Sequence, residues 1–105
     1  MRVHSKFFLP VLIGFPESEG RLECWGRILD LGALGARIAT TAQLASREPL
    51  HLSFELHGES FAGLTGSVVR SGLDEDGYCR SEVRFASPGD RLRLGRVLRG
   101  LLASR

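Results

Sequence analysis

The chain has 105 residues, of which 43% are hydrophobic and 25% charged, and its formal net charge is +2. This length fits one domain over residues 1–105 that buries roughly 65% of the surface of its unfolded chain, and the composition excludes a disordered protein. The small net charge, without interleaved basic and aromatic residues, also argues against nucleic-acid binding.

The N-terminal region joins a basic segment, residues 1–6 with Arg2 and Lys6, to an apolar run over 7–15. This order imitates a signal peptide, but no small-x-small cleavage site follows, and the run is too short to span a bilayer. We therefore predict a first β-strand over 7–15 in a cytoplasmic protein without membrane insertion. Cys24 and Cys79 lie far apart without a Cys-x-x-Cys motif, so we predict small buried residues rather than metal ligands or a disulfide.

A second strand is predicted over 21–30, with Leu22, Cys24 and Ile28 on one face. Trp25 and Arg27 fall on the opposite face of the same strand and cannot share its interior. We therefore expect Trp25 to lie under the C-terminal helix or beside the first strand.

A glycine-rich corner, Asp30-x-Gly32-x-x-Gly35, joins this strand to a third strand over 36–40. Glycine adopts positive φ and lets backbone or ligand come close, and Asp30 can accept a hydrogen bond from a nearby backbone N–H. These six residues alone fit an ordinary hairpin corner as well as a ligand-binding corner, so both interpretations stay open.

Three further strands are predicted, over 50–56, 61–70 and 78–86, after a segment over 41–46 that is compatible with one helical turn. Gly63 and Gly66 predict bulges or sharp corners in the fifth strand. His51 and His57 alternate with apolar residues and are expected to face solvent. No nucleophile with a base and no third metal ligand accompanies them, so we predict neither an enzyme nor a zinc site.

A C-terminal helix is predicted over 88–103, with Ser87 as N-cap, Pro88 at the first helical position and Asp90 in the first turn. An apolar stripe at helical spacing is formed by Leu94, Val97, Leu98, Leu101 and Leu102. The stripe packs either on the domain's own sheet or on a protein partner.

Six short strands separated by turns and followed by one helix predict an all-β fold: a six-stranded antiparallel β-barrel with a C-terminal α-helix, because such a sheet must cover or join its edges. The side chains expected in its single core are Phe7, Leu9, Val11, Leu52, Phe54, Val83 and Phe85.

Over nearly its whole length the chain resembles the PilZ domain, the bacterial receptor module for cyclic di-GMP. The matching segments are the basic N-terminus, FFLPVLIGF at 7–15, the corner at 30–35, LHLSFEL at 50–56, GSVVR at 66–70, VRF at 83–85 and the final helix. In that family an R-x-x-x-R motif before the first strand and a D/N-x-S-x-x-G corner grip the ligand. Here the first motif is Arg2-x-x-x-Lys6, and Gly32 replaces the serine.

The resemblance implies a ligand site made of Arg2, Lys6, Asp30, Gly32 and Gly35. It implies a cyclic di-GMP receptor or adaptor domain in bacterial second-messenger signalling, with weak or altered affinity and no other cofactor. The alternative is a protein-interaction adaptor that no longer binds cyclic di-GMP. Its partner would contact the C-terminal helix or the face carrying Tyr78, Arg80 and Arg84.

Overall fold

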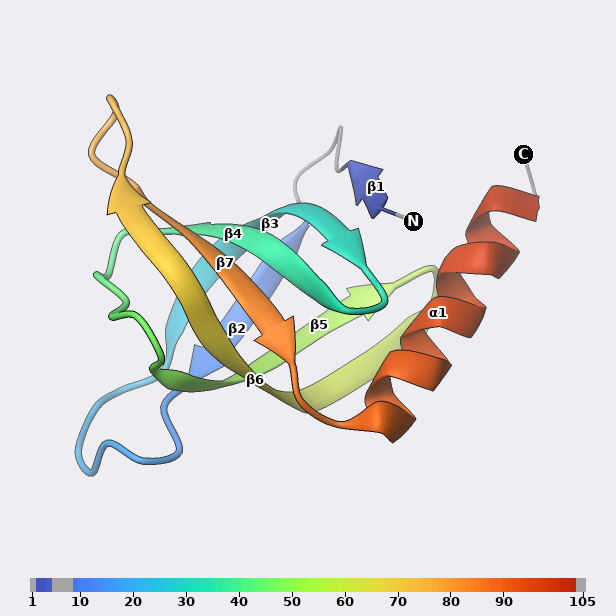
Figure 1. Ribbon diagram of the computed structural model, residues 1–105, viewed down its shortest axis with the longest axis horizontal. Coiled ribbons are helices and arrows are strands. Elements are labelled where there is room, and N and C mark those ends of the chain that lie inside the picture. The colour runs from blue at the N-terminus through green and yellow to red at the C-terminus, as the bar shows by residue number, and fades with distance from the viewer. Residues whose placement is uncertain (1, 5–8, 104–105) are drawn as a thin grey trace.

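The computed structural model describes residues 2–4 and 9–103, which contain seven strands and one helix (Figure 1). The elements are β1 Arg2–His4, β2 Pro10–Gly14, β3 Cys24–Gly32, β4 Gly35–Thr40, β5 Pro49–Leu56, β6 Glu59–Leu73, β7 Cys79–Phe85 and α1 Pro88–Ala103. No helix in this part of the chain is long and apolar enough to cross a membrane.

Six of these strands close into the predicted antiparallel barrel. They pair in the order β3-β2-β5-β6-β7-β4, and β3 also pairs with β4, which completes the ring. The helix α1 stands beside one end of the barrel, next to the hairpin between β3 and β4 (Figure 1). Closure removes the free edges that a small antiparallel sheet would otherwise expose.

The short strand β1 lies outside this ring and extends the edge of β3. Residues 24–27 of β3 pair with β2, whereas residues 30–32 pair with β1, with Arg2 opposite Gly32 and His4 opposite Asp30. The N-terminal segment therefore lies beside the end of β3 that carries the glycine-rich corner.

The predicted core is confirmed for the residues that the structure describes. Val11, Leu52, Phe54, Val83 and Phe85 are buried in one cluster, and Leu9 is half-buried against it. Phe7 lies outside the described residues. The alternation of apolar and polar side chains was sufficient to predict the core, because each strand has only one face turned toward the barrel interior.

A bulge in the hairpin of β5 and β6 confirms the role predicted for Gly63. Leu52 pairs with Leu64 and Phe54 with Phe61, so the β6 strand carries one extra residue at this point. Gly63 adopts a positive φ of 64°, and its N–H donates to the Ser53 hydroxyl at 2.8 Å. The segment 41–48, by contrast, contains a turn and no helical residues.

The helix packs Leu94, Val97 and Leu98 of its apolar stripe on the barrel itself. Leu94 and Leu98 belong to the core cluster, and Ser87 caps the helix by accepting from the Asp90 N–H at 3.4 Å. The Arg93 guanidinium lies 4.3 Å from the Phe61 ring centre and donates to the Ser60 carbonyl. Because these three side chains are used internally, they are not available to a partner, which would contact the outer, arginine-bearing side of α1.

Trp25 lies on the outer face of β3 and is 65% exposed. It pairs with Leu12 of β2, which is the strand predicted first, over 7–15. The expected position beside that strand is therefore confirmed. The expected position under α1 is wrong, because the helix covers the opposite end of the barrel, where the β3–β4 hairpin turns (Figure 1).

The two-residue turn between β5 and β6 yields a stability prediction. His57 and Gly58 have φ values of 52° and 77°, the left-handed pair that favours Asn-Gly. His57→Asn should therefore raise the free energy of unfolding by about 0.5 kcal/mol in urea denaturation, since Asn tolerates this conformation better. The control His51→Asn, in the middle of β5, should give no gain, and an equal gain would contradict the argument.

Candidate ligand-binding site

The glycine-rich corner begins with a bulge that decides where Asp30 points. Ile28 pairs with Ile38 and Asp30 with Arg37, so Leu29 is an extra residue in β3. Without it, Asp30 would follow Ile28 onto the barrel interior, because one residue of slip exchanges the two faces of a strand. The bulge places Asp30 on the outer face, opposite Arg37.

Asp30 is nevertheless almost completely covered. Its side chain is 2% exposed and accepts a hydrogen bond from Nε of Arg37, whose own side chain is 55% exposed. The strand β3 continues to Gly32, so Asp30 lies inside the strand and not at its end as predicted. The carboxylate is therefore covered, and the Arg37 guanidinium bound to it is the exposed partner of the pair.

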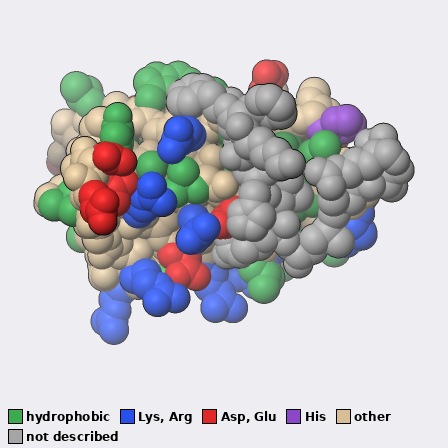
Figure 2. Space-filling model, turned by 90° about the horizontal axis from the view of Figure 1, so that it is seen from above, with side chains coloured by type: hydrophobic (Ala, Val, Ile, Leu, Met, Phe, Trp, Pro, Cys, Tyr) green, Lys and Arg blue, Asp and Glu red, His purple; other side chains and the backbone are tan. Residues whose placement is uncertain are grey.

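Four side chains of alternating charge cross the outer face in one row, from β3 through β4 and β7 to β6. Asp30 pairs in register with Arg37, Arg37 with Glu82, and Glu82 with Arg70. The Nε atom of Arg70 lies 2.8 Å from the Glu82 carboxylate. We call Asp30, Arg37, Glu82 and Arg70 the charge row. Figure 2 shows basic and acidic side chains intermingled over this side of the barrel.

The two glycines of the corner have different surroundings. Gly32 is the buried last residue of β3. A Cβ atom on Gly35 would lie 2.1 Å from the Val83 carbonyl oxygen, so a side chain there collides with β7. Gly35 is therefore required by the close approach of β4 and β7, whether or not a ligand binds.

The structure brings part of the predicted basic motif to this corner. The backbone of Arg2 pairs with Gly32, and that of His4 with Asp30. Lys6 lies outside the described residues. Of the five predicted site residues, Arg2, Asp30, Gly32 and Gly35 thus come from neighbouring stretches of β1, β3 and β4.

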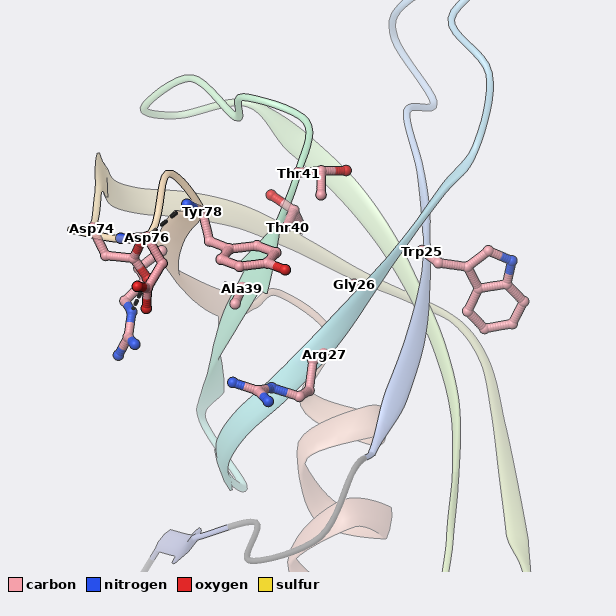
Figure 3. Close-up of a pocket in the computed structure, with 10 residues that line it drawn as sticks. Trp25, Gly26, Arg27, Ala39, Thr40, Thr41, Asp74, Asp76 and Tyr78 are labelled. Atoms are coloured by element: carbon pink, nitrogen blue, oxygen red, sulfur yellow. Dashed lines mark hydrogen bonds and ion pairs between the residues drawn. The ribbon is translucent and has the colours of Figure 1, made fainter.

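Two hollows open on the same outer face. One, of about 440 Å³, lies along the charge row and is lined by Leu29, Arg37, Arg70 and Glu82 among others. The second, of about 420 Å³, lies at the other end of β3 and β4. We call it the Tyr78 pocket, and its wall includes Gly26, Arg27, Ala39, Thr41, Tyr78 and Arg80 (Figure 3).

The turn from β6 to β7 is ordered by Asp74. Its carboxylate accepts from the backbone N–H groups of Asp76 and Tyr78 at 2.9 and 3.0 Å, and from Nε of Arg80 at 2.7 Å. The hydrogen bond from Arg80, with those from the backbone, holds the pKa of the Asp74 carboxyl below its usual value. Asp74 therefore fixes where Tyr78 leaves the turn.

Metal and thiol chemistry have little support in the described residues. They contain no group of three His, Cys, Asp or Glu side chains that could hold a metal ion. Cys79 is buried and Cys24 is half-buried, and burial raises the pKa of the Cys24 thiol. The exposed positions predicted for His51 and His57 are confirmed.

No family model and no curated protein matches the sequence, but solved structures match the fold. YcgR from Escherichia coli in complex with c-di-GMP gives a TM-score of 0.76 at 14% identity, over 99% of this chain and 45% of that one. The Bacillus subtilis inhibitor of motility, MotI/DgrA, gives 0.70 at 20% identity, over 99% and 51%. The PilZ domain of CeSA from a cellulose-synthesizing bacterium gives 0.66 at 21% identity, over 96% and 97%.

The chain has the fold of a PilZ domain. This PilZ-like chain spans about half the length of the YcgR and MotI/DgrA chains and nearly all of the CeSA domain. The likeness therefore concerns the domain and not the larger proteins that contain it.

Sequence reasoning missed Arg37 and the Tyr78 pocket. The pairing of Arg37 with Asp30 could not be predicted, because only the bulge at Leu29 places the two residues opposite each other. The pocket was missed because it joins Arg27 of β3 to Tyr78 of the β6–β7 turn, two segments that are distant in the sequence. The exposed face of Tyr78 and Arg80 was a signal, but it did not indicate a hollow.

The corner glycine gives a prediction that separates packing from ligand binding. Gly35→Ala should lower the free energy of unfolding by about 1–3 kcal/mol in urea denaturation, since the added methyl group overpacks the contact with Val83. The control Gly72→Ala lies in β6 with nothing within 4 Å of its added Cβ. If both variants lose the same stability, the close approach of β4 and β7 is not the cause.

The Asp74 turn gives a pH prediction. Because the folded pKa of Asp74 is lowered from 3.8, the folded state binds fewer protons than the unfolded state. Its stabilising contribution is therefore present above the unfolded pKa and lost as the pH falls through the folded pKa. Asp74→Asn should be less stable than the natural protein at pH 7, and urea titrations should show the difference shrinking toward about pH 2.

The matched control for Asp74 is Asp76→Asn, because the Asp76 carboxylate accepts no hydrogen bond from the described residues. This variant should show no such pH-dependent loss. A difference for Asp74→Asn that persists unchanged at low pH would contradict the ionic origin of the effect.

Proposed function

We propose that this PilZ-like chain is a cytoplasmic cyclic di-GMP-binding receptor or adaptor domain, with weak or altered affinity, in bacterial second-messenger signalling. The observation that carries the proposal is the pairing of β1 with β3, which sets the backbone of Arg2 opposite Gly32, two residues from Asp30. Residues 2–4, the described part of the stretch that resembles the first PilZ ligand motif, therefore lie beside the strand that carries the second motif. The similar structure of YcgR contains c-di-GMP, which supports the same ligand class for this chain.

The chemistry of the proposed site follows from what cyclic di-GMP presents: two phosphates and two guanine Hoogsteen edges. Arg2 would grip guanine or phosphate through its planar fork, and Lys6 would add charge near a phosphate. Asp30 would accept from guanine N1–H and N2–H. Gly32 and Gly35 would let the ligand approach the backbone.

Three features lower the expected affinity. Lysine at position 6 cannot form the bidentate contact, which is worth about 1–3 kcal/mol, and Gly32 lacks a serine hydroxyl worth about 1 kcal/mol. Together these changes weaken binding by about a hundredfold or more. In addition, Arg37 already holds the Asp30 carboxylate, so a guanine edge must share or replace that contact.

The same three features favour a second function, that of a protein-interaction adaptor without cyclic di-GMP. In that case the Asp30–Arg37 pair is a structural part of the charge row and not a ligand contact. The partner would contact the outer face that carries Tyr78, Arg80 and Arg84, or the outer side of α1. Neither function requires a catalytic group, and we propose a binding module and not an enzyme.

Isothermal titration with cyclic di-GMP tests the first function. Asp30→Asn should weaken binding by about 1–3 kcal/mol, because guanine donors lose a charged acceptor. The double variant Lys6→Arg with Gly32→Ser should tighten binding, because it restores the fork and the hydroxyl. A thermal melt of each variant is needed because Asp30 also pairs with Arg37.

Asp74→Asn is the matched control, since Asp74 also binds an arginine on the outer face but lies in the β6–β7 turn. It should leave the affinity for cyclic di-GMP unchanged. Binding by the double variant alone would favour the adaptor function, with the site as a relic. Absence of binding by both the natural protein and the double variant would reject cyclic di-GMP as the ligand.

A further inference from the structure

The Tyr78 pocket arises from the row of side chains next to the charge row. In this second row Arg27 pairs with Ala39, Ala39 with Arg80, and Arg80 with Gly72. Ala39 and Gly72 are too small to fill the outer face between the longer side chains. A hollow of about 420 Å³ therefore opens over Ala39, between β3 and the β6–β7 turn.

The two arginines that border this hollow differ in their partners. Arg80 is paired with Asp74, with 2.7 Å between Nε and the carboxylate oxygen. Arg27 is exposed and has no ion pair or hydrogen bond to its side chain within residues 9–101, because its cross-strand neighbour is Ala39. In the charge row, Arg37 and Arg70 each pair with a carboxylate. In the second row, Arg27 has no carboxylate as a cross-strand neighbour.

Hydroxyl donors lie around the same opening. Figure 3 shows the Tyr78 hydroxyl directed toward β3, while the Arg27 guanidinium extends from β3 toward the β6–β7 turn. Thr41 also lines the hollow. The hydroxyl groups of Tyr78 and Thr41 have no partner among the described side chains and backbone groups. A guanidinium fork and a hydroxyl donor, from Arg27 and Tyr78, on one opening match the two oxygens of a carboxylate.

The remaining surroundings restrict the ligand. Gly26, Ala39 and the Tyr78 ring give the wall an apolar part, which suits an apolar or aromatic body next to the charge. Asp74 and Asp76 line the hollow from the β6–β7 turn. Asp74 is paired with Arg80, and the negative charge of Asp76 disfavours a dianion and directs an anionic group toward Arg27. Arg27, which has no ion pair with the described residues, therefore fits a ligand with a single negative charge.

We propose that the Tyr78 pocket is a second binding site, separate from the Asp30 corner, for a carboxylate carried on an apolar or aromatic group. Arg27 binds the carboxylate in a bidentate manner, Tyr78 contributes its hydroxyl and ring, and Ala39 forms the floor. Two sources share this chemistry: a free aromatic acid, and an acidic residue beside an aromatic one in a protein segment.

The test is a chemical-shift titration of the whole isotope-labelled chain with 3-phenylpropionate, up to about 20 mM because single-fragment affinities are weak. We expect saturable shifts at the backbone amides of Arg27, Ala39, Thr41 and Tyr78. The neutral amide 3-phenylpropionamide has the same body without the charge and should bind at least about tenfold more weakly, as expected for loss of a charge-assisted pair.

Three variants locate the contact. Arg27→Gln should weaken 3-phenylpropionate at least about tenfold. Its matched control is Arg84→Gln, because Arg84 is also exposed on this face without an ion pair to the described residues, and this variant should bind normally. Asp30→Asn should also leave this titration unchanged, so failure of the cyclic di-GMP site does not affect the result.

Two further ligands complete the test. The blocked dipeptide acetyl-Phe-Glu-amide should bind more tightly than 3-phenylpropionate if a protein segment is the source, and more weakly if a free acid is. Either order supports the carboxylate site. Equal binding of the acid and the amide, normal binding by Arg27→Gln, no shifts at the pocket, or a tenfold preference for phenyl phosphate would each overturn the proposal.

Discussion

Closure of the barrel through β4 is the constraint on which the rest of the structure depends. This strand has only six residues, yet it pairs with β3 on one edge and β7 on the other. Its backbone passes so near to β7 that Gly35 leaves no room for a side chain. Because β3, β4, β7 and β6 are thereby held in register, outward side chains from four strands line up in rows. Both candidate sites are built from these rows.

The bulge at Leu29 gives the outer face its charge pattern. It brings Asp30 out of the barrel interior and opposite Arg37, which completes a row of alternating charges with Glu82 and Arg70. An arginine that holds a covered carboxylate can orient that carboxylate for a ligand, and it also competes with the ligand for the same oxygens. In the proposed site, the balance between these two effects would decide whether the corner binds cyclic di-GMP.

The neighbouring row has the opposite character. Small residues separate its arginines, so it contains a hollow and a guanidinium without a carboxylate partner in the described chain. Two adjacent rows on one barrel thus provide a nearly neutral surface and an anion-accepting pocket. The proposed cyclic di-GMP site at the β3–β4 corner and the proposed carboxylate site would lie at opposite ends of the same strands.

The sequence by itself determined the architecture. Alternating residues such as Leu52 and Phe54 indicated which faces are buried, and Ser87 with Pro88 indicated where the helix begins. These signals are local, because strand alternation and helix capping depend on residues a few positions apart. The resemblance to PilZ domains likewise depended on the order of short motifs, and the fold agrees with it.

Only the tertiary structure decided how the outer face is arranged. The extra residue Leu29 moves Asp30 to the face opposite the one that simple alternation predicts, and no glycine marks this bulge as Gly63 marks the one in β6. The pairing of Arg37 with Asp30, the exclusion of a side chain at Gly35 by Val83, and the meeting of Arg27 with Tyr78 all join different strands. Such contacts depend on the register between strands, which is set when the whole barrel closes.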